Sequence, residues 1–384
     1  MSLLFYFLFI VSLLYLCSDK TQGNRTQKIR IAYFWVFFVS ATRFNIGNDY
    51  EDYVGQINYF LEVLRLHPDL QDAYNQRVVH YEIANIFIIK LFSSFPRPYV
   101  WIFATYSLIN TFFLYLVLKR DNAHYWGIFI FIVCEFLFVS WDMVRQASAV
   151  MICFYAINLL REESFFKKFI FFKYEALVLF ASLFHTTALV MIPFFVIRWI
   201  RINKWVLIGI LIVAVVLMWT GILVSLQEQV AFYATFVDDY EKYATNDSTL
   251  QTAESTLYKL RLLLYAILWG QILFHLPERE HVLRFFLTLG GVGFLFAMNS
   301  LSIMRLSWYF LVVIIISLPL AINNINGRFY LIWFKRTLFA MLLLFAMDIV
   351  RDSNVRGCGT YKSIFSEDFI EERFNSRELQ NNHD

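Results

Sequence analysis

The chain has 384 residues, of which 59% are hydrophobic, 20% aromatic and 16% charged, and its formal net charge is +3. Soluble domains carry about 25% charged residues, so this composition excludes a soluble enzyme. The positive charge is small and spread along the chain in short clusters, which excludes a nucleic-acid-binding surface. Four cysteines, at positions 17, 134, 153 and 358, share no metal-ligand spacing, so we expect neither a disulfide framework nor a zinc site.

Apolar segments follow one another along the chain and predict an all-α, polytopic membrane protein with about 12 transmembrane helices. The predicted spans are 1–17, 29–44, 99–118, 123–140, 141–160, 165–184, 186–200, 204–221, 258–276, 282–300, 302–322 and 331–349. The first segment lacks the basic start and the small-residue cleavage site of a signal peptide, so we expect it to be retained. Residues 1–349 would form one transmembrane domain, followed by a polar tail at 350–384.

Basic residues in the short loops set the orientation, because the positive-inside bias counts Lys and Arg. All basic loops fall on one side, the cytoplasmic one, if the apolar stretch 82–95 does not cross. We therefore interpret 82–95 as an interfacial or re-entrant helix, and leave open whether 186–200 crosses. Two long acidic loops, 45–98 and 222–257, then lie outside together with both termini, and the working face is expected to be external.

Arg145 lies in the segment S-W-D-M-V-R-Q-A-S-A-V, near the external end of the predicted span 141–160. A guanidinium at membrane depth costs roughly 2.5–3.5 kcal/mol on insertion scales, so it faces a cavity or a fixed partner. We interpret Arg145 as an anion contact, with Gln146 as a second polar group beside it. The alternative is an internal ion pair with Asp142, three residues away on the same helical face.

Three further arginines, Arg43, Arg261 and Arg305, lie at or near the external ends of their predicted spans. Together with Arg145 they would place four cations around one external cavity. Arginine suits a diphosphate, since it offers paired donors and does not lose its charge. For any one of them alone, snorkelling to the membrane interface is the simpler interpretation.

Two residues are candidates for a catalytic base. His185 lies in F-H-T-T-A-L-V-M-I-P and titrates near neutrality; a buried structural histidine is the alternative. Asp49 follows the turn at Gly47, and Tyr50 and Tyr53 share a helical face with it. A carboxylate beside aromatic rings suits sugar hydroxyls and the apolar faces of sugars, although tyrosines are also common at membrane interfaces.

The order of these motifs resembles the EpsG family, which belongs to the wider group of Wzy-type polysaccharide polymerases. The shared motifs are R-x-x-x-G-N-D-Y-x-x-Y after the second span, Y-E-I-A-N-I-F with Glu82 at its head, R-Q-A-S-A, F-H-T-T-A-L-V-M-I-P and a terminal Y-K-S-I-F. The resemblance covers nearly the whole chain. It implies a GT-C-like helical bundle in the bacterial cytoplasmic (inner) membrane, in exopolysaccharide, capsule or O-antigen biosynthesis.

Carried onto this chain, the resemblance implies a glycosyltransferase-type polymerase that joins oligosaccharide repeat units linked to undecaprenyl diphosphate. The catalytic candidates are His185 and Asp49. The expected substrate-binding residues are Arg145, Gln146, Arg305, Arg43, Tyr50, Tyr53 and Glu82. We expect no cofactor and no metal, and interpret the acidic pair Asp238-Asp239 as part of a solvated loop.

The expected partners are the lipid-linked oligosaccharide, the lipid bilayer, and the flippase and chain-length regulator of the same pathway, with no nucleic acid. Two other functions remain open. A systematic internal repeat would favour a flippase or exporter of lipid-linked oligosaccharides, and we find none in the sequence. A noncatalytic membrane component of a polysaccharide assembly complex would need none of the buried charges.

Overall fold

The computed structural model describes residues 2–18, 24–47, 49–66, 82–162, 167–220, 256–297, 301–351 and 361–365. The helices of the first half are α1 (Ser2–Cys17), α2 (Arg25–Ala41), α3 (Tyr50–Leu66), α5 (Ile83–Phe92), α6 (Pro98–Arg120), α7 (His124–Val133), α8 (Phe136–Asp142) and α9 (Val144–Leu160). Those of the second half are α10 (Lys167–Ser182), η1 (Thr186–Trp199), α11 (Lys204–Thr220), α15 (Thr256–His275), η2 (Glu278–Glu280), α16 (His281–Phe296), α17 (Leu301–Leu311), α18 (Ile314–Asn323) and α19 (Arg328–Arg351). The described residues form no β-strand, which confirms the all-helical prediction for them.

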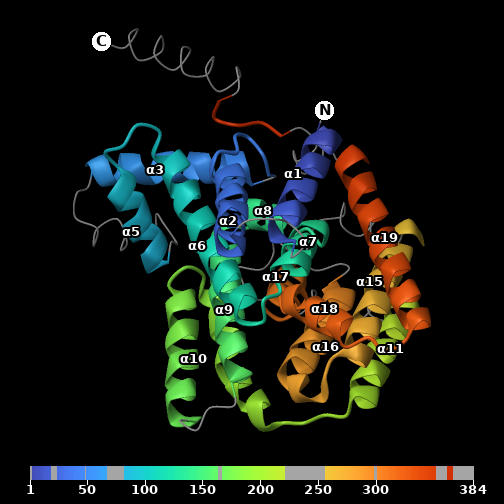
Figure 1. Ribbon diagram of the computed structural model, residues 1–384. Coiled ribbons are helices and arrows are strands. Elements are labelled where there is room, and N and C mark those ends of the chain that lie inside the picture. Colours follow the sequence, from blue (N-terminus) through green and yellow to red (C-terminus); the bar gives the residue numbers. More distant parts are fainter. Residues whose placement is uncertain are drawn as a thin grey trace.

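Helix α9 is enclosed by other helices. It packs against α6, α8, α10, α17 and η1, and α6 and α10 are seen beside it in Figure 1. Every α9 side chain except Arg145 and Tyr155 is buried. A helix that is apolar all round is typical of such an interior position. Ser148 of α9 donates a hydrogen bond of 3.0 Å to Asn110 of α6, and membrane helices commonly use such polar contacts between neighbours.

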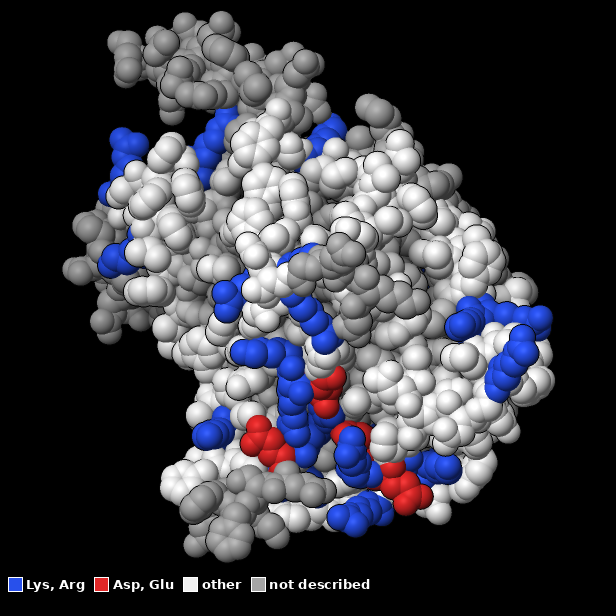
Figure 2. Space-filling view, viewed as in Figure 1, with Lys and Arg blue, Asp and Glu red and all other residues white. Residues whose placement is uncertain are grey.

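Large apolar side chains cover the outer faces of the peripheral helices. On α11, for example, Trp205, Val213 and Trp219 are about half exposed or more. Soluble monomers rarely expose apolar surface on this scale. Helices that face lipid do, and a helix is suited to lipid because it satisfies its own backbone hydrogen bonds. In the view of Figure 2, charged side chains gather toward the lower end, and much of the remaining described surface is uncharged.

Three described segments are long and apolar enough to cross a membrane: Pro98–Arg120, Ile303–Asn323 and Arg328–Met347. The pair formed by α7 and α8 becomes a fourth if it is counted as one bent span. This finding confirms the prediction of membrane-capable helices. The count of twelve spans stays a prediction.

The predicted spans 123–140 and 141–160 are interrupted in the structure, and 302–322 is divided into α17 and α18. Helices α7 and α8 meet at a bend of 53°, because Glu135 between them has the left-handed φ of 64°, which cannot continue a right-handed helix. The predicted helix 141–160 is also broken, since α8 ends at Asp142 and α9 begins after Met143. Asp142 and Arg145 therefore do not share a continuous helical face, and the spacing argument for their pairing was wrong.

The two segments whose crossing was left open differ in reach. Helix α5 has 10 residues and is about 15 Å long, half of a typical hydrocarbon core. Segment η1 has 14 residues but is a 3-10 helix, with Pro193 inside it. At about 2.0 Å per residue it extends about 28 Å, compared with about 21 Å for an α-helix of the same length. The 3-10 geometry thus gives a short apolar segment nearly the length of a full crossing.

The loops that the positive-inside bias places on one side meet at one end of the bundle. Arg161, which follows α9, forms ion pairs of 2.7 Å with Asp121 after α6 and with Glu280 before α16. Arg25 at the start of α2 donates a hydrogen bond of 2.8 Å to Asn122. The predicted loop 45–98 contains helices α3 and α5, whereas most of the predicted loop 222–257, with Asp238 and Asp239, lies outside the described residues.

Candidate functional site

Glu82, Arg145 and their neighbours form a polar cluster between α5, α9 and the turn that precedes η1. Arg145 Nη1 lies 2.8 Å from Glu82 Oε2, and the side chains are 22% and 12% exposed. The guanidinium of Arg145 also lies over the ring of Tyr53, 5.9 Å from its centroid. We call this group the Glu82–Arg145 cluster. It joins three residues that the sequence predicted as substrate contacts.

Asn85 holds the acid of this cluster in place. Its Nδ2 donates to Glu82 Oε2 at 2.7 Å and to the carbonyl oxygen of Phe184 at 3.1 Å, and its Oδ1 accepts a hydrogen bond from the Tyr106 hydroxyl. Asn85 is fully buried, so these bonds are shielded from water. The backbone N–H of Ala84 donates to the carbonyl of Leu183 as well. Helix α5 is thereby fixed by its first turn to the segment that carries His185.

Gln146 connects the cluster to Arg305. It is buried, and its Nε2 donates a hydrogen bond of 2.8 Å to the backbone carbonyl of Arg305 on α17. The structure thus shows Gln146 bonded to the backbone of another predicted site residue, and its predicted contact with substrate stays a prediction. The Arg305 guanidinium lies 3.8 Å from the Asp49 carboxylate, and both side chains are about one third exposed. Arg145 and Arg305, from two adjacent helices, therefore belong to one site.

His185 uses its Nδ1 atom inside the protein. Nδ1 lies 2.7 Å from Thr187 Oγ1 and accepts the backbone N–H of Thr187 at 3.4 Å, which caps the start of η1. Thr187 Oγ1 lies 3.0 Å from the Tyr309 hydroxyl. A ring nitrogen that accepts a backbone N–H carries no proton, so this pattern assigns the proton of the neutral ring to Nε2.

The charges that act on His185 are those of Glu82, Arg145 and Arg305, so His185 lies in the same site as these residues. Burial lowers the pKa of His185 below its ordinary value of 6.5; Glu82 raises it in opposition, and Arg145 and Arg305 lower it further. At neutral pH the ring is therefore uncharged. His185 lies between α10 and η1, outside both helices.

Asp49 is positioned by the turn before α3. Gly47 has a φ of 106°, which favours glycine, and a Cβ there would come within 2.9 Å of an Asp142 carboxylate oxygen. The Asp49 carbonyl accepts the N–H of Tyr53 at 2.9 Å in the first turn of α3, as the sequence pattern predicted. Burial raises the pKa of Asp49 above its ordinary value, while Arg305 lowers it and Asp52 raises it.

Arg43 and Tyr50 are placed differently from the other predicted residues. Arg43 is 2% exposed and lies over the rings of Phe103 and Trp141, at 4.9 and 5.9 Å from their centroids. Tyr50 is 4% exposed and packs against Phe103 as well. These two side chains belong to the packed interior beneath the Asp49 turn.

The Y-K-S-I-F motif, residues 361–365, pairs with the residues that lead into this turn. Phe44 N–H donates to the Lys362 carbonyl at 3.0 Å, and Ile364 N–H donates to the Thr42 carbonyl at 2.9 Å. The Tyr361 hydroxyl donates to the Val39 carbonyl at 2.8 Å. A segment of the predicted polar tail thus contacts the end of α2, more than 300 positions earlier in the chain.

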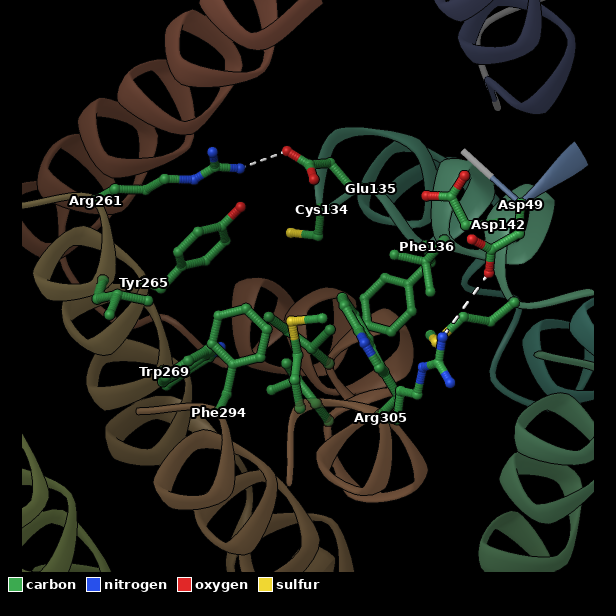
Figure 3. A pocket seen from close by; sticks show the side chains of 17 residues that line it. Asp49, Cys134, Glu135, Phe136, Asp142, Arg261, Tyr265, Trp269, Phe294 and Arg305 are labelled. Atoms are coloured by element: carbon green, nitrogen blue, oxygen red, sulfur yellow. Dashed lines mark hydrogen bonds and ion pairs between the residues drawn. The ribbon is translucent and has the colours of Figure 1, made fainter. Parts of the chain in front are cut away.

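A cavity of about 260 Å³ opens beside Asp49 and Arg305. Figure 3 shows the Asp49–Arg305 pair at one side of it and a second ion pair, Glu135–Arg261, at another, with aromatic rings between them. Arg261 is one of the four arginines predicted to surround a cavity, whereas Glu135 was missed. A carboxylate in the apolar run F-I-V-C-E-F-L-F is itself a signal, since ionisable residues at membrane depth are costly. We call this space the aromatic cavity.

No group of three or more His, Cys, Asp or Glu side chains in the described ranges has a geometry that could hold a metal ion. Within the described residues, the candidate site consists of arginines, carboxylates, one histidine and aromatic rings. Such a set can bind an anion, accept hydrogen bonds from hydroxyl groups and take up a proton.

Comparison with known proteins gives one match. A sequence model of the EpsG family matches residues 28–363, nearly the whole chain. Neither a curated protein nor a solved structure matches.

Proposed function

The chain belongs to the EpsG family, a family of polysaccharide-biosynthesis membrane proteins, and on that premise we propose that it joins lipid-linked oligosaccharide repeat units into a polysaccharide. In this proposal it acts in the bacterial inner membrane, on units carried by undecaprenyl diphosphate, with its site on the outer face. The pathway makes an exopolysaccharide, a capsule or an O-antigen. The flippase and the chain-length regulator of that pathway are its proposed partners.

The observation that carries the proposal is the convergence of Arg145, Arg305, Asp49 and His185 from separate parts of the chain. Two arginines on adjacent helices suit the two phosphates of a leaving diphosphate, because guanidinium groups offer paired donors of fixed charge. Stabilisation of developing negative charge is the main demand of this reaction. A structural scaffold would gain nothing from burying these charges partly in a membrane protein.

In the proposed reaction, a sugar hydroxyl of one unit attacks the anomeric carbon of the other. The new glycosidic C–O bond forms as the bond from that carbon to the diphosphate oxygen breaks. Undecaprenyl diphosphate leaves with the electron pair, bound by Arg145 and Arg305. Asp49 takes the proton of the attacking hydroxyl, and its raised pKa makes it a stronger base than an exposed carboxylate.

His185 has a different role in this scheme. With Nδ1 occupied by Thr187, the neutral ring presents an Nε2–H group, which donates a hydrogen bond rather than accepting a proton. We assign this donor to a phosphate or sugar oxygen of the substrate. Of the two bases predicted from the sequence, the geometry therefore favours Asp49.

The test is deletion of the chain from its own cell, followed by analysis of the lipid-linked glycans. A polymerase deletion leaves single repeat units on the lipid carrier and no long polymer. Complementation with Asp49→Asn should leave the same single units while the protein accumulates normally. If the deletion strain makes polymer of normal length, or if its repeat units stay on the cytoplasmic side as expected for a missing flippase, the proposal is wrong.

A further inference from the structure

The aromatic cavity is bounded by two ion pairs that belong to different elements. Asp49 and Arg305 are 3.8 Å apart, next to the Glu82–Arg145 cluster. Glu135, at the bend between α7 and α8, lies 2.5 Å from Arg261 on α15. In Figure 3 the Glu135–Arg261 pair lies at the upper left of the cavity and the Asp49–Arg305 pair at its right, while Tyr265, Trp269 and Phe294 line the left and lower left.

The walls between the ion pairs are a continuous series of aromatic rings. Neighbouring ring centroids are 5.9 Å apart for Tyr265 and Trp269, 6.0 Å for Trp269 and Phe294, 5.7 Å for Phe294 and Trp308, and 4.9 Å for Trp308 and Phe136. The indole N–H groups of Trp269 and Trp308 are buried and have no hydrogen-bond partner in the part of the chain that the structure describes. Flat apolar faces beside polar donors and acceptors suit a ring that has both apolar faces and hydroxyl groups.

Glu135 is held in an unfavourable backbone conformation. Its φ is 64°, a left-handed value that costs about 1–2 kcal/mol for a residue with a side chain. Glutamate is not among the residue types enriched there; of the other side-chain-bearing residues with positive φ in the described ranges, Asn45 and Asn122 are of an enriched type and Arg97 is not. Strained residues of this kind concentrate at binding and catalytic sites. In this conformation Glu135 lines the cavity and its carboxylate pairs with Arg261.

We propose that the aromatic cavity binds one sugar ring, with the Glu135 carboxylate accepting hydrogen bonds from its hydroxyls and Arg261 fixing that carboxylate. This ring is the sugar that carries the diphosphate, an identification that rests on the proposed function. The Arg305 side of the cavity adjoins Arg145, and these two arginines are the proposed diphosphate contacts. The volume of about 260 Å³ is just below the range of drug-sized sites and therefore fits one ring rather than an oligosaccharide.

Two other occupants fit less well. A prenyl chain has no hydrogen-bonding groups and would leave both ion pairs unsolvated against hydrocarbon. A diphosphate at the Glu135 end of the cavity would lie beside the Glu135 carboxylate, which repels it, and Arg261 at that end is already paired with the same carboxylate. A neutral or amidated sugar avoids both penalties.

The test is a binding experiment on the full chain in lipid nanodiscs. The probes are methyl glycosides of neutral hexoses, N-acetylhexosamines and hexuronic acids, which have neither lipid nor phosphate. Binding is measured by quenching of tryptophan fluorescence, since Trp269 and Trp308 line the cavity. We expect at least one glycoside to bind saturably in the millimolar range, and Glu135→Gln to weaken it at least tenfold.

Glu135→Gln removes the carboxylate that pairs with Arg261 and could impair folding, so a paired variant, Glu135→Gln with Arg261→Met, removes both charges. The matched control is Glu278→Gln, an exposed glutamate that precedes α16. Unchanged affinity in folded Glu135 variants, or no glycoside binding by the unaltered chain, overturns the sugar site.

A second probe separates this inference from the proposed function. Farnesyl diphosphate has the lipid and phosphates but no sugar, and Arg145→Ala should weaken its binding. If glycosides bind but farnesyl diphosphate does not, the sugar site stands and the diphosphate site of the proposed polymerase fails. If farnesyl diphosphate binds in an Arg145-dependent manner and no glycoside binds, the sugar site alone is wrong.

Discussion

The Glu82–Arg145 ion pair allows the structural and functional roles of Arg145 to be separated. Arg145→Ala leaves the Glu82 carboxylate, only 12% exposed, with Asn85 as its remaining hydrogen-bond donor among the contacts described above. Removing one partner of a buried pair costs about 3–5 kcal/mol, and an exposed pair contributes about 0–1 kcal/mol. With exposures of 22% and 12%, the pair lies between these limits, so we expect a loss of about 2 kcal/mol.

The double variant Arg145→Met with Glu82→Gln leaves no stranded charge, so it should recover most of that stability. It should not recover polymer, because the diphosphate contact is missing. Arg145→Lys keeps a charge but loses the paired donors, and polymerisation should fall about 10–100-fold, corresponding to a lost charged hydrogen bond of about 1.5–3 kcal/mol. The matched control is Arg328→Lys, an exposed arginine at the start of α19, which should be neutral.

Both quantities are measured on the same set of variants. Stability is the midpoint of thermal unfolding of the protein in detergent, and activity is polymer length together with the pool of single lipid-linked units in complemented deletion cells. If the double variant restores polymer as well as stability, Arg145 is only structural. If Arg145→Ala unfolds at the same temperature as the unaltered chain, the reasoning from burial is wrong.

Three further predictions use the same assays. His185→Asn keeps an acceptor for the Thr187 N–H but loses the Nε2–H donor, so the protein should stay stable and lose polymer. His185→Gln should retain more activity at lower stability, and equal losses of polymer in both variants would favour a base role instead. Because burial lowers the pKa of His185 below 6.5, the contribution of His185 to stability should be constant above about pH 6.5 and be lost below it as pH drops through the lowered pKa. The decline on acidification should therefore be smaller in His185→Asn than in the unaltered chain, and an equal decline in both would contradict the shift. Tyr361→Phe removes the hydroxyl that donates to the Val39 carbonyl and should lower the free energy of unfolding by about 1 kcal/mol, with shorter polymer if the pairing of 361–365 positions the Asp49 turn. Normal stability would show that this hydrogen bond does not stabilise the protein.

The sequence was sufficient for the features that depend on local chemistry. Long apolar runs predicted helices because a helix satisfies its own backbone in lipid, and most observed helices match those runs to within a few residues. Gly47 marked a turn because few other residues adopt a positive φ there. The cost of an arginine at membrane depth singled out Arg145 before any partner was known.

Tertiary structure decided which residues meet. Arg145 pairs with Glu82, 63 positions away, and Gln146 bonds the carbonyl of Arg305, 159 positions away. Neither contact has a local pattern, because it depends on how α5, α9 and α17 pack. The breaks at Glu135 and Met143, inside apolar runs, and the 3-10 geometry of η1 likewise escaped hydropathy. Hydropathy measures only whether a segment prefers lipid to water, whereas backbone bends and ion pairs are set by the neighbours against which each helix packs.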